Sequence, residues 1–355
     1  MITKTQKSGY ILVLSLMIVG AIMVLVTQLF RQGQTHMAFV HTMVEREKAK
    51  MLALSGIEIA RCQLTIPKPK KEQKTKISTE TKQKKVNPAH LFLQRVLPTI
   101  NRWQTFTFKE KRDGMDGTIK MALSCEEGKL NINRLFDFEK KKFKGEGKLT
   151  GNMQDILKRL LEASKKFIKA DLFGPLQTFL AKRERPLDDT TQLLSVPHFD
   201  QFKHTIFYQP ITANKIQGNI FLTDIFTIWS DSAKLEPWLL SHSLCAILNL
   251  KVAAGDDIVN RKQQVELLTR NFKPKATWSN DWDVAFKELY GKTFSMLPQG
   301  FSSLLNSEFE PNTFGVLVQG TAGKVTQKVY AILKRNIDDS SSYYEEPEII
   351  KLYWL

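Results

Sequence analysis

The strongest constraint on this chain is an uncharged apolar run, Tyr10 to Phe30, close to its N-terminus. A helix of this length rises about 30 Å, which matches the hydrocarbon core of a bilayer. Lys4 and Lys7 lie before the run and no acidic residue does, so the positive-inside rule predicts that the short tail stays in the cytoplasm. We therefore expect residues 10–30 to span a membrane once and everything after Phe30 to be exported.

A cleaved secretory signal is one alternative explanation of this run. Such a signal has an apolar region of about 7 to 15 residues and ends at a small-residue cleavage site. This run is longer and leads into Gln28, Leu29, Phe30 and Arg31, so a secretory signal is not favoured. An uncleaved single-pass anchor stays open, because length and charge alone agree with it equally well.

The same helix is predicted to continue outside the membrane. No proline follows until Pro67, and Gly33 is the one weak point, costing about 1 kcal/mol against alanine. Five apolar residues fall on one helical face between charged positions: Met37, Val40, Val44, Met51 and Leu54. We expect residues 10–64 to form one amphipathic helix, half in lipid and half packed through this stripe on a globular domain.

Gly9 lies at the border between the basic leader and the apolar run. A short basic leader that ends in glycine before a long apolar helix resembles the type IV prepilin signal. The resemblance implies that a prepilin peptidase removes residues 1–9 by cutting between Gly9 and Tyr10. It also implies methylation of the new N-terminus at Tyr10.

Two further motifs narrow the family. The first lies within Leu52 to Ala60 and contains Gly56, Ile57 and Glu58. The second lies within Glu126 to Asn133 and contains Gly128, Asn131 and Asn133. Together with Gly9 they resemble the K-type minor pseudopilin of type II secretion (general secretion pathway protein K), of which this chain would be a diverged member. Residues 234–241 stand where the family carries a second asparagine motif, and both asparagines are lost there.

Leu14 is the fifth residue counted from Tyr10, where most pilins and pseudopilins carry glutamate. By resemblance, that carboxylate pairs with the N-terminal amine of a neighbouring subunit, which offsets the cost of burying either charge alone. A subunit with Leu14 cannot make this contact with a subunit above it. The resemblance therefore implies a position at the tip of the filament.

The resemblance also implies the fold: α+β, pilin-like, with a long N-terminal transmembrane and amphipathic helix, an antiparallel sheet head and an inserted α-helical domain. The predicted parts are the leader at 1–9, the helix at 10–64, a Lys-rich disordered linker at 65–88, the first part of the head at 89–134, the inserted domain at 135–220 and the second part of the head at 221–355.

Local patterns agree with this division. Apolar residues at helical spacing over 153–181, interrupted by Gly174-Pro175, predict two helices joined by a turn. β-Branched and aromatic residues over 219–229 predict a strand at which the sheet resumes. The remaining predictions are a short helix-turn segment at 191–201, a helix at 244–248, a hairpin of 313–320 with 328–335, and a last strand at 349–354.

The net charge of +16 invites a nucleic-acid interpretation. Much of the excess lies between Lys68 and Lys85, where no aromatic residue is interleaved to stack on bases. A solvated, disordered loop is the preferred interpretation of this segment, and contact with anionic lipid stays open. Nucleic acid is not an expected partner.

The sequence shows no catalytic motif. The six histidines form no H-E-x-x-H pattern, and Gly320 to Lys324 lacks the spacing of a phosphate-binding loop. Ser241-His242-Ser243 has no partner whose proximity can be inferred. We expect that the chain is not an enzyme.

Metal binding follows only from the resemblance, because family members can hold calcium with carboxylate and carbonyl oxygens. No cofactor is certain, and no ligand is named. None of the oxygen-rich candidates has the spacing of an EF-hand loop. They are Asp256-Asp257, Asp281 with Asp283, and Asp338-Asp339 with Glu345-Glu346. Ser279 or Asn280 is better explained as a helix cap before Trp282.

The three cysteines, Cys62, Cys125 and Cys245, are widely spaced and form no C-x-x-C pair. An exported chain can form at most one internal disulfide from them. Three buried thiols explain the pattern equally well.

By resemblance, this chain is expected at the tip of the pseudopilus, where its helix packs beside those of two other minor pseudopilins. The residues assigned to this assembly helix are Met37, Val40, Val44, Met51 and Leu54. That complex would start the pseudopilus and support protein export across the outer membrane. Before assembly the chain would lie in the inner membrane with its head in the periplasm, and its partners would include the secretion assembly platform and prepilin peptidase. Two alternatives stay open: a minor pilin of a DNA-uptake or adhesive type IV pilus, and an uncleaved single-pass periplasmic binding protein.

Overall fold

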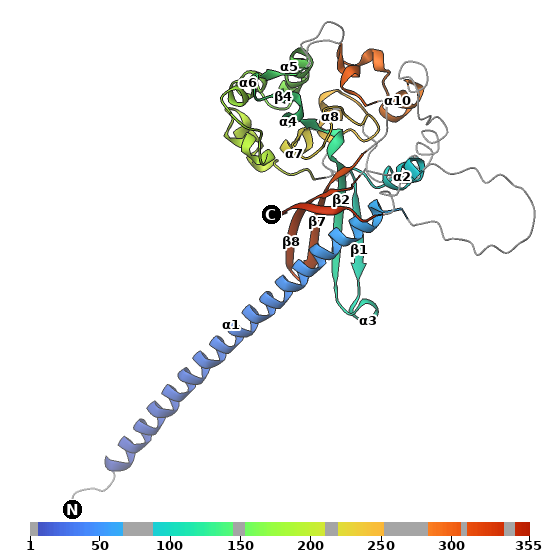
Figure 1. The fold of residues 1–355 in the computed structure, drawn as a ribbon. Coiled ribbons are helices and arrows are strands. Elements are labelled where there is room, and N and C mark those ends of the chain that lie inside the picture. Colours follow the sequence, from blue (N-terminus) through green and yellow to red (C-terminus); the bar gives the residue numbers. More distant parts are fainter. Residues whose placement is uncertain are drawn as a thin grey trace, which may run out of the picture.

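A single long helix, α1 (Gln6–Leu64), dominates the computed structural model and projects from a mixed α/β head (Figure 1). It is continuous through Gly33 and begins at Gln6 rather than at the predicted Tyr10. The Lys-rich segment lies outside the described residues. These are 6–66, 88–144, 153–209, 219–251, 283–306, 311–336 and 345–355.

The head is built around a five-stranded antiparallel sheet with the order β1-β2-β7-β8-β9. The strands are β1 (Trp103–Phe108), β2 (Gly117–Cys125), β7 (Thr313–Ala322), β8 (Val325–Lys334) and β9 (Glu348–Trp354). The predicted C-terminal hairpin and last strand are therefore confirmed. So is the α+β class with a long N-terminal helix and an antiparallel sheet head.

The half of α1 nearest the head packs across this sheet through small side chains. Its inner face consists of buried residues: Ala49, Leu52, Ala53, Gly56, Ile57, Ala60 and Leu64. Gly320 on β7 lies against the backbone of Ala49 and Ala53, and a Cβ at Gly320 would collide with it. The helix therefore approaches the sheet as closely as two backbones allow.

This packing corrects one prediction. The stripe Met37, Val40, Val44, Met51 and Leu54 was expected to pack on the head, but all five residues are exposed. At about 100° per residue, the stripe lies on the side of α1 opposite the inner face. The helix can approach the sheet this closely only on the side that carries alanine and glycine. The bulky side chains of the stripe therefore point away from the sheet.

A large helical insertion separates the two central strands. Strands β2 and β7 are hydrogen-bonded neighbours although residues 126–312 lie between them in sequence. Figure 1 shows this insertion at the end of the sheet away from the N-terminus of α1. It contains two small ladders, formed by β3 (Leu130–Asn131) with β6 (Phe226–Thr227) and by β4 (Phe136–Asp137) with β5 (Lys142–Phe143).

The prediction that the sheet resumes at 219–229 is wrong. Residues 222–225 form a helical turn, α7 (Leu222–Ile225), and only Phe226 and Thr227 are extended in a ladder. The apolar side chains that suggested a strand are buried in the core of the insertion. Burial in this helical surrounding overrides their β-propensity.

The predicted helical insertion is present, but the segment between β2 and β7 spans 126–312 rather than the predicted 135–220, because the chain does not return to the sheet at 221. The break between the helices at 153–181 also differs from the prediction. Helix α5 (Met153–Ala163) ends well before Gly174-Pro175, and α6 (Phe173–Ala181) holds Pro175 in its first turn, where a missing N–H costs nothing. The other helices within the described residues are α2 (Pro88–Val96), α3 (Glu110–Asp113), α4 (Ile132–Leu135), α8 (His242–Ile247) and α10 (Asp283–Tyr290). The 3-10 turns are η1 (Glu126–Gly128), η2 (Ser164–Lys166), η3 (Thr190–Ser195), η4 (Phe199–His204), η6 (Phe294–Met296) and η7 (Phe301–Leu304).

One cluster of buried apolar side chains runs from the inner face of α1 through the sheet into the insertion. It includes Ile57 of α1, Val318 of β7 and Leu160 of α5. Sheet, helix and insertion therefore share one hydrophobic core.

Candidate functional site

The outer face of α1, which we define as Met37, Val40, Val44, Met51 and Leu54, is an apolar surface that the head leaves uncovered. The exposed fraction is 77% for Met37 and 57% for Met51. Soluble surfaces rarely keep such a contiguous row of large apolar side chains, and such rows mark sites of protein or membrane contact.

The outer face continues into the apolar N-terminal half of the helix. Within the described residues, the stretch Tyr10–Leu64 is the one helix whose length and apolar composition allow it to cross a membrane. Its N-terminal half has no contact with the head, and Tyr10 and Leu14 are exposed there. Gly9 lies within the helical backbone of α1. Cleavage after Gly9 and methylation of Tyr10 stay predictions.

The first family motif lies where α1 meets the sheet. A Cβ at Gly56 would press on Val318 and Ile119, so only glycine fits this contact without a shift. Ile57 is buried beside it. Glu58 points to solvent and pairs with Arg61 at 2.7 Å.

Arg61 connects α1 to the segment that leads into β9. Its Nε donates to the carbonyl of Pro347 at 2.9 Å, and its Nη2 lies 3.1 Å from Glu346. Glu58 therefore positions an arginine that ties the helix to the start of the last strand.

The second motif, Glu126 to Asn133, is mostly buried, and we call it the hub. Gly128 packs against the backbone of Leu239, and a Cβ there would collide with its carbonyl oxygen. The Gly128 carbonyl accepts from the N–H of Ser241 at 3.0 Å, and the Glu127 carbonyl accepts from that of Glu236 at 2.8 Å. Residues 234–241 are thus held to this motif by backbone contacts.

Two charged side chains of the motif form a buried ion pair. Lys129 Nζ lies 2.5 Å from Glu126 Oε1, and Tyr330 donates its hydroxyl to the same oxygen at 3.1 Å. Thr227 donates to the other oxygen at 2.5 Å. Burial lowers the pKa of Lys129, but the charges of Glu126 and its neighbours outweigh it and hold that pKa above its usual value. Lys129 is therefore a fixed cation that compensates Glu126.

The two asparagines of the motif both make several polar contacts, three by Asn131 and two by Asn133. Asn131 donates to the Ser230 carbonyl at 2.5 Å and accepts from the Arg134 N–H at 3.1 Å, which caps α4. Asn133 exchanges a pair of hydrogen bonds, both 2.8 Å, with the backbone of Leu187. The amide of Asn133 thus joins the hub to the helical insertion.

Glu127 is a second buried carboxyl group, next to Glu126. It accepts the N–H of Thr313, the first residue of β7, at 3.1 Å and the thiol of Cys125 at 3.3 Å. Burial raises the pKa of Glu127 to about 7. This carboxyl group therefore gains its proton at near-neutral pH in the folded protein.

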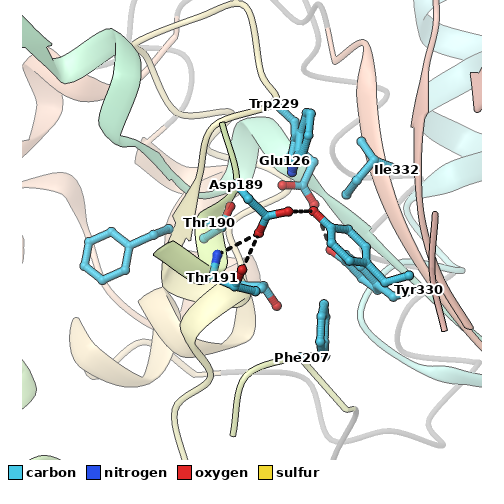
Figure 2. Close-up of a pocket in the computed structure, with 11 residues that line it drawn as sticks. Glu126, Asp189, Thr190, Thr191, Phe207, Trp229, Tyr330 and Ile332 are labelled. Carbon is cyan, nitrogen blue, oxygen red and sulfur yellow. Dashed lines mark hydrogen bonds between the residues drawn. The ribbon is translucent and has the colours of Figure 1, made fainter. Parts of the chain in front are cut away.

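A small pocket lies between the insertion and the sheet (Figure 2). Asp189 begins η3 there, accepts from the N–H of Thr191 at 2.8 Å, and accepts the Tyr353 hydroxyl of β9 at 2.6 Å. Phe207 packs between Tyr330 and Tyr353, with ring centroids at 5.1 and 5.6 Å. The pocket has room for about one water molecule, which is too little for a substrate. We call the contact of η3 with strands β8 and β9 around it the seam.

The Ser241-His242-Ser243 triplet forms the start of α8. Ser241 caps the helix by accepting from the N–H of Leu244 at 3.2 Å, and Ser243 donates its N–H to buried Asp224 at 2.6 Å. Burial raises the pKa of Asp224 and lowers that of His242. The hydroxyl of Ser243 accepts from the Phe221 N–H at 3.0 Å. Each serine therefore has a structural contact.

No group of three or more His, Cys, Asp or Glu side chains gathers as a metal site within the described residues. Asp283 accepts from the N–H of Phe294 at 2.8 Å, and Glu346 pairs with Arg61. The other calcium candidates, except Glu345, lie outside the described residues, as does the predicted cap at Ser279 or Asn280. Calcium binding stays a prediction.

All three thiols are free. Cys125 and Cys245 are buried, and burial raises the pKa of both. Cys62 is exposed near the end of α1, so the alternative of three buried thiols is wrong.

No protein-family model matches the chain, and no curated protein is similar to it in sequence. Its fold is similar to a chain in the crystal structure of the GspK-GspI-GspJ complex from the enterotoxigenic Escherichia coli Type 2 Secretion System. The two chains share 11% sequence identity with a TM-score of 0.35, over 75% of this chain and 91% of that chain. The likeness is a distant one, in fold alone.

Proposed function

We propose that this chain is a minor pseudopilin that lies at the tip of the type II secretion pseudopilus, initiates its assembly and supports protein export across the outer membrane. The mechanism is assembly of helices, without a catalytic step. Residues 10–30 anchor the chain in the inner membrane, the N-terminus faces the cytoplasm, and the head lies in the periplasm.

The observation that carries the proposal is the division of α1 into two opposite faces. The inner face is buried on the sheet through Ala49, Ala53 and Gly56. On the opposite side, Met51 and Leu54 present large apolar side chains over the same turns, and the outer face continues from them toward the N-terminus. A helix that served only as an anchor would not need apolar residues on its solvent side. Burial of such a face against other helices gives about 25 cal/mol per Å² of apolar area.

The tip position rests on Leu14. It replaces the glutamate that, by family resemblance, neutralises the amine of the next subunit. A chain without this carboxylate can support subunits below it but offers no charge partner above it. The helical insertion lies at the far end of the head from the membrane, where a terminal subunit has room for it (Figure 1).

Assembly requires partners at each stage. We propose that prepilin peptidase removes residues 1–9 and that the mature N-terminus is methylated at Tyr10. Other minor pseudopilins then cover the outer face, and the inner-membrane assembly platform adds further subunits below.

The test is the mass of the N-terminal peptide from the full chain extracted from its native membrane. A methylated Tyr10 at the N-terminus is expected. Gly9→Val should leave the leader attached, whereas the matched Gly20→Val, at a helix position with nothing within 4 Å, should still be processed.

Two results would contradict the proposal. A native chain that keeps Met1 to Gly9 would be an uncleaved single-pass protein. Filaments labelled along their whole shaft by an antibody to this chain would exclude a tip position. Salt-dependent binding of DNA by the processed chain would instead favour a minor pilin of an uptake pilus.

A further inference from the structure

Glu47 is an acidic residue in the middle of the apolar outer face. We infer that it is the charge-pairing position of that face, and that the helix which covers it carries a lysine or arginine opposite Glu47. The inference rests on the proposed function, because it specifies the partner of the same face.

The carboxylates of the three acidic residues of α1 differ in the partners that they contact. Glu45 is mostly buried and accepts from the N–H of Lys324 in the β7–β8 turn at 3.4 Å. Glu58 pairs with Arg61 at 2.7 Å. Glu47 is 67% exposed, and in the part of the chain that the structure describes its ion pair is with Lys50, at the long distance of 4.0 Å. Glu47 is thus the acid whose charge this chain satisfies least.

Lys50 is also engaged elsewhere. Its Nζ lies 5.8 Å from the centre of the Trp354 ring on β9, within the range of a cation–π contact. Lys50 therefore leans from α1 toward the edge of the sheet. It is therefore poorly placed to neutralise the Glu47 carboxylate when a partner covers the outer face.

The charge of Glu47 matters because this residue lies within the outer face. At about 100° per residue it falls between Val40 and Leu54 within the arc of the outer face. Any helix that covers Val44 and Met51 must also cover the Glu47 carboxylate. A carboxylate that is taken from water without a partner opposes binding, whereas one that meets a cation does not.

The kind of partner follows from the continuity of the face. The same arc runs toward the membrane through Met37, Gly33 and Leu29, and Gly33 has nothing within 4 Å, so another helix can approach closely there. A partner that covers the whole stripe must itself enter the bilayer beside α1. It is therefore a membrane-anchored helix that runs parallel to α1, with its cation in the part outside the membrane.

A second copy of this chain does not meet this requirement. In a parallel two-fold pair, equivalent residues face each other across the axis. Glu47 would then lie near Glu47 of the second copy, and two like charges would repel at the centre of the contact. The occupant is accordingly a different chain.

The test is site-specific photocrosslinking of the full-length chain in its native membrane. A photoreactive amino acid replaces Val44, about one turn from Glu47, and mass spectrometry identifies the crosslinked peptide. Yields are compared for the parent, Glu47→Gln and Glu47→Lys. Glu162→Lys, at an exposed position of α5, is the control for the same change in net charge.

The expected crosslinked peptide belongs to the helix of another membrane-anchored protein and has a lysine or arginine within one turn of the crosslink. Glu47→Lys should lower the yield about tenfold and Glu47→Gln by less, because only the lysine adds repulsion. Exchanging the partner's cation for glutamate should restore the Glu47→Lys yield. Glu162→Lys should leave the yield unchanged.

Several results would overturn the inference. They are an unchanged yield in Glu47→Lys, a crosslink to a second copy or to lipid alone, a partner peptide without a nearby cation, or no protein crosslink at all. These results separate the two proposals. If Tyr10 is the methylated N-terminus and helix crosslinks persist in Glu47→Lys, the charge pairing fails while the proposed function stands.

Discussion

Lys129 places its Nζ atom 2.5 Å from Oε1 of Glu126, and neither side chain reaches solvent. Tyr330 of strand β8 donates its hydroxyl to the same carboxylate. Burying two charges is costly, so the pair stabilises the fold only while both members are present. This relationship makes the motif a requirement for a folded head.

Lys129→Met should therefore strongly destabilise the protein. It leaves the Glu126 charge buried without a cation, which costs about 3 to 5 kcal/mol. Adding Glu126→Gln to this variant should recover part of the loss, because the uncompensated charge is then gone. Urea unfolding of the full chain in detergent, followed by circular dichroism, measures both. Lys334→Met, which breaks a surface pair with Asp231 at 2.9 Å, is the control and should cost less than about 1 kcal/mol.

Glu127 should make stability fall as pH rises through neutrality. Its pKa is about 7 in the folded protein against an ordinary value of 4.5, so the folded state binds this proton more tightly. The resulting stabilisation is complete below about pH 4.5 and is lost as pH rises through about 7. The loss is on the order of 3 kcal/mol, since one pKa unit corresponds to about 1.4 kcal/mol.

Glu127→Gln should remove this dependence, because the amide stays neutral and can still accept from the Thr313 N–H. Free energies of unfolding at pH 5, 6, 7 and 8 provide the comparison. Glu139→Gln, at an exposed position, should keep the parent slope. An equal slope in the parent and Glu127→Gln would show that another group titrates.

Gly128→Ala should prevent correct packing of the hub. The added methyl group would collide with the carbonyl of Leu239, which is backbone and cannot rotate away. A cost of about 2 kcal/mol or more is expected, as for overpacked cores. Gly33→Ala is the matched control, because Gly33 has nothing within 4 Å and alanine favours the helix by up to about 1 kcal/mol. Equal melting temperatures for the two variants would contradict the described contact.

Tyr353→Phe should loosen the seam between the last strand and the insertion. It removes the hydroxyl that donates to Asp189 at 2.6 Å, a bond to a charged group that is worth about 1.5 to 3 kcal/mol. A double-mutant cycle with Asp189→Asn measures the coupling. Independent, additive effects of the two substitutions would mean that the bond contributes nothing.

Much of the fold could be predicted from the sequence because its signals are local. The run Tyr10 to Phe30 is long and apolar enough to cross a membrane, and two strand-like segments joined by a turn at Gly323 predict the C-terminal hairpin. The choice of the packed face of α1 could not be predicted in this way. It depends on Gly320, far along the chain, which offers the helix a site only small residues can enter.

The candidate site shows the same limit. Resemblance identified Gly128, Asn131 and Asn133, but not what they contact. Their partners lie in distant segments, such as Leu187 for Asn133. Asp189 and Tyr353 were not singled out at all, because an aspartate pair before a threonine pair and a tyrosine in a terminal strand carry no functional signal. Their meeting across the seam is a property of the folded chain.

The adjacency of β2 and β7 sets the order in which this protein can mature. Strands β7 and β8, which cover most of the inner face of α1, are synthesised after the whole of residues 126–312, whereas β2 precedes that segment. The inner face of the helix therefore stays largely uncovered until the final hairpin has been made, and the head can close around its core only at that late point.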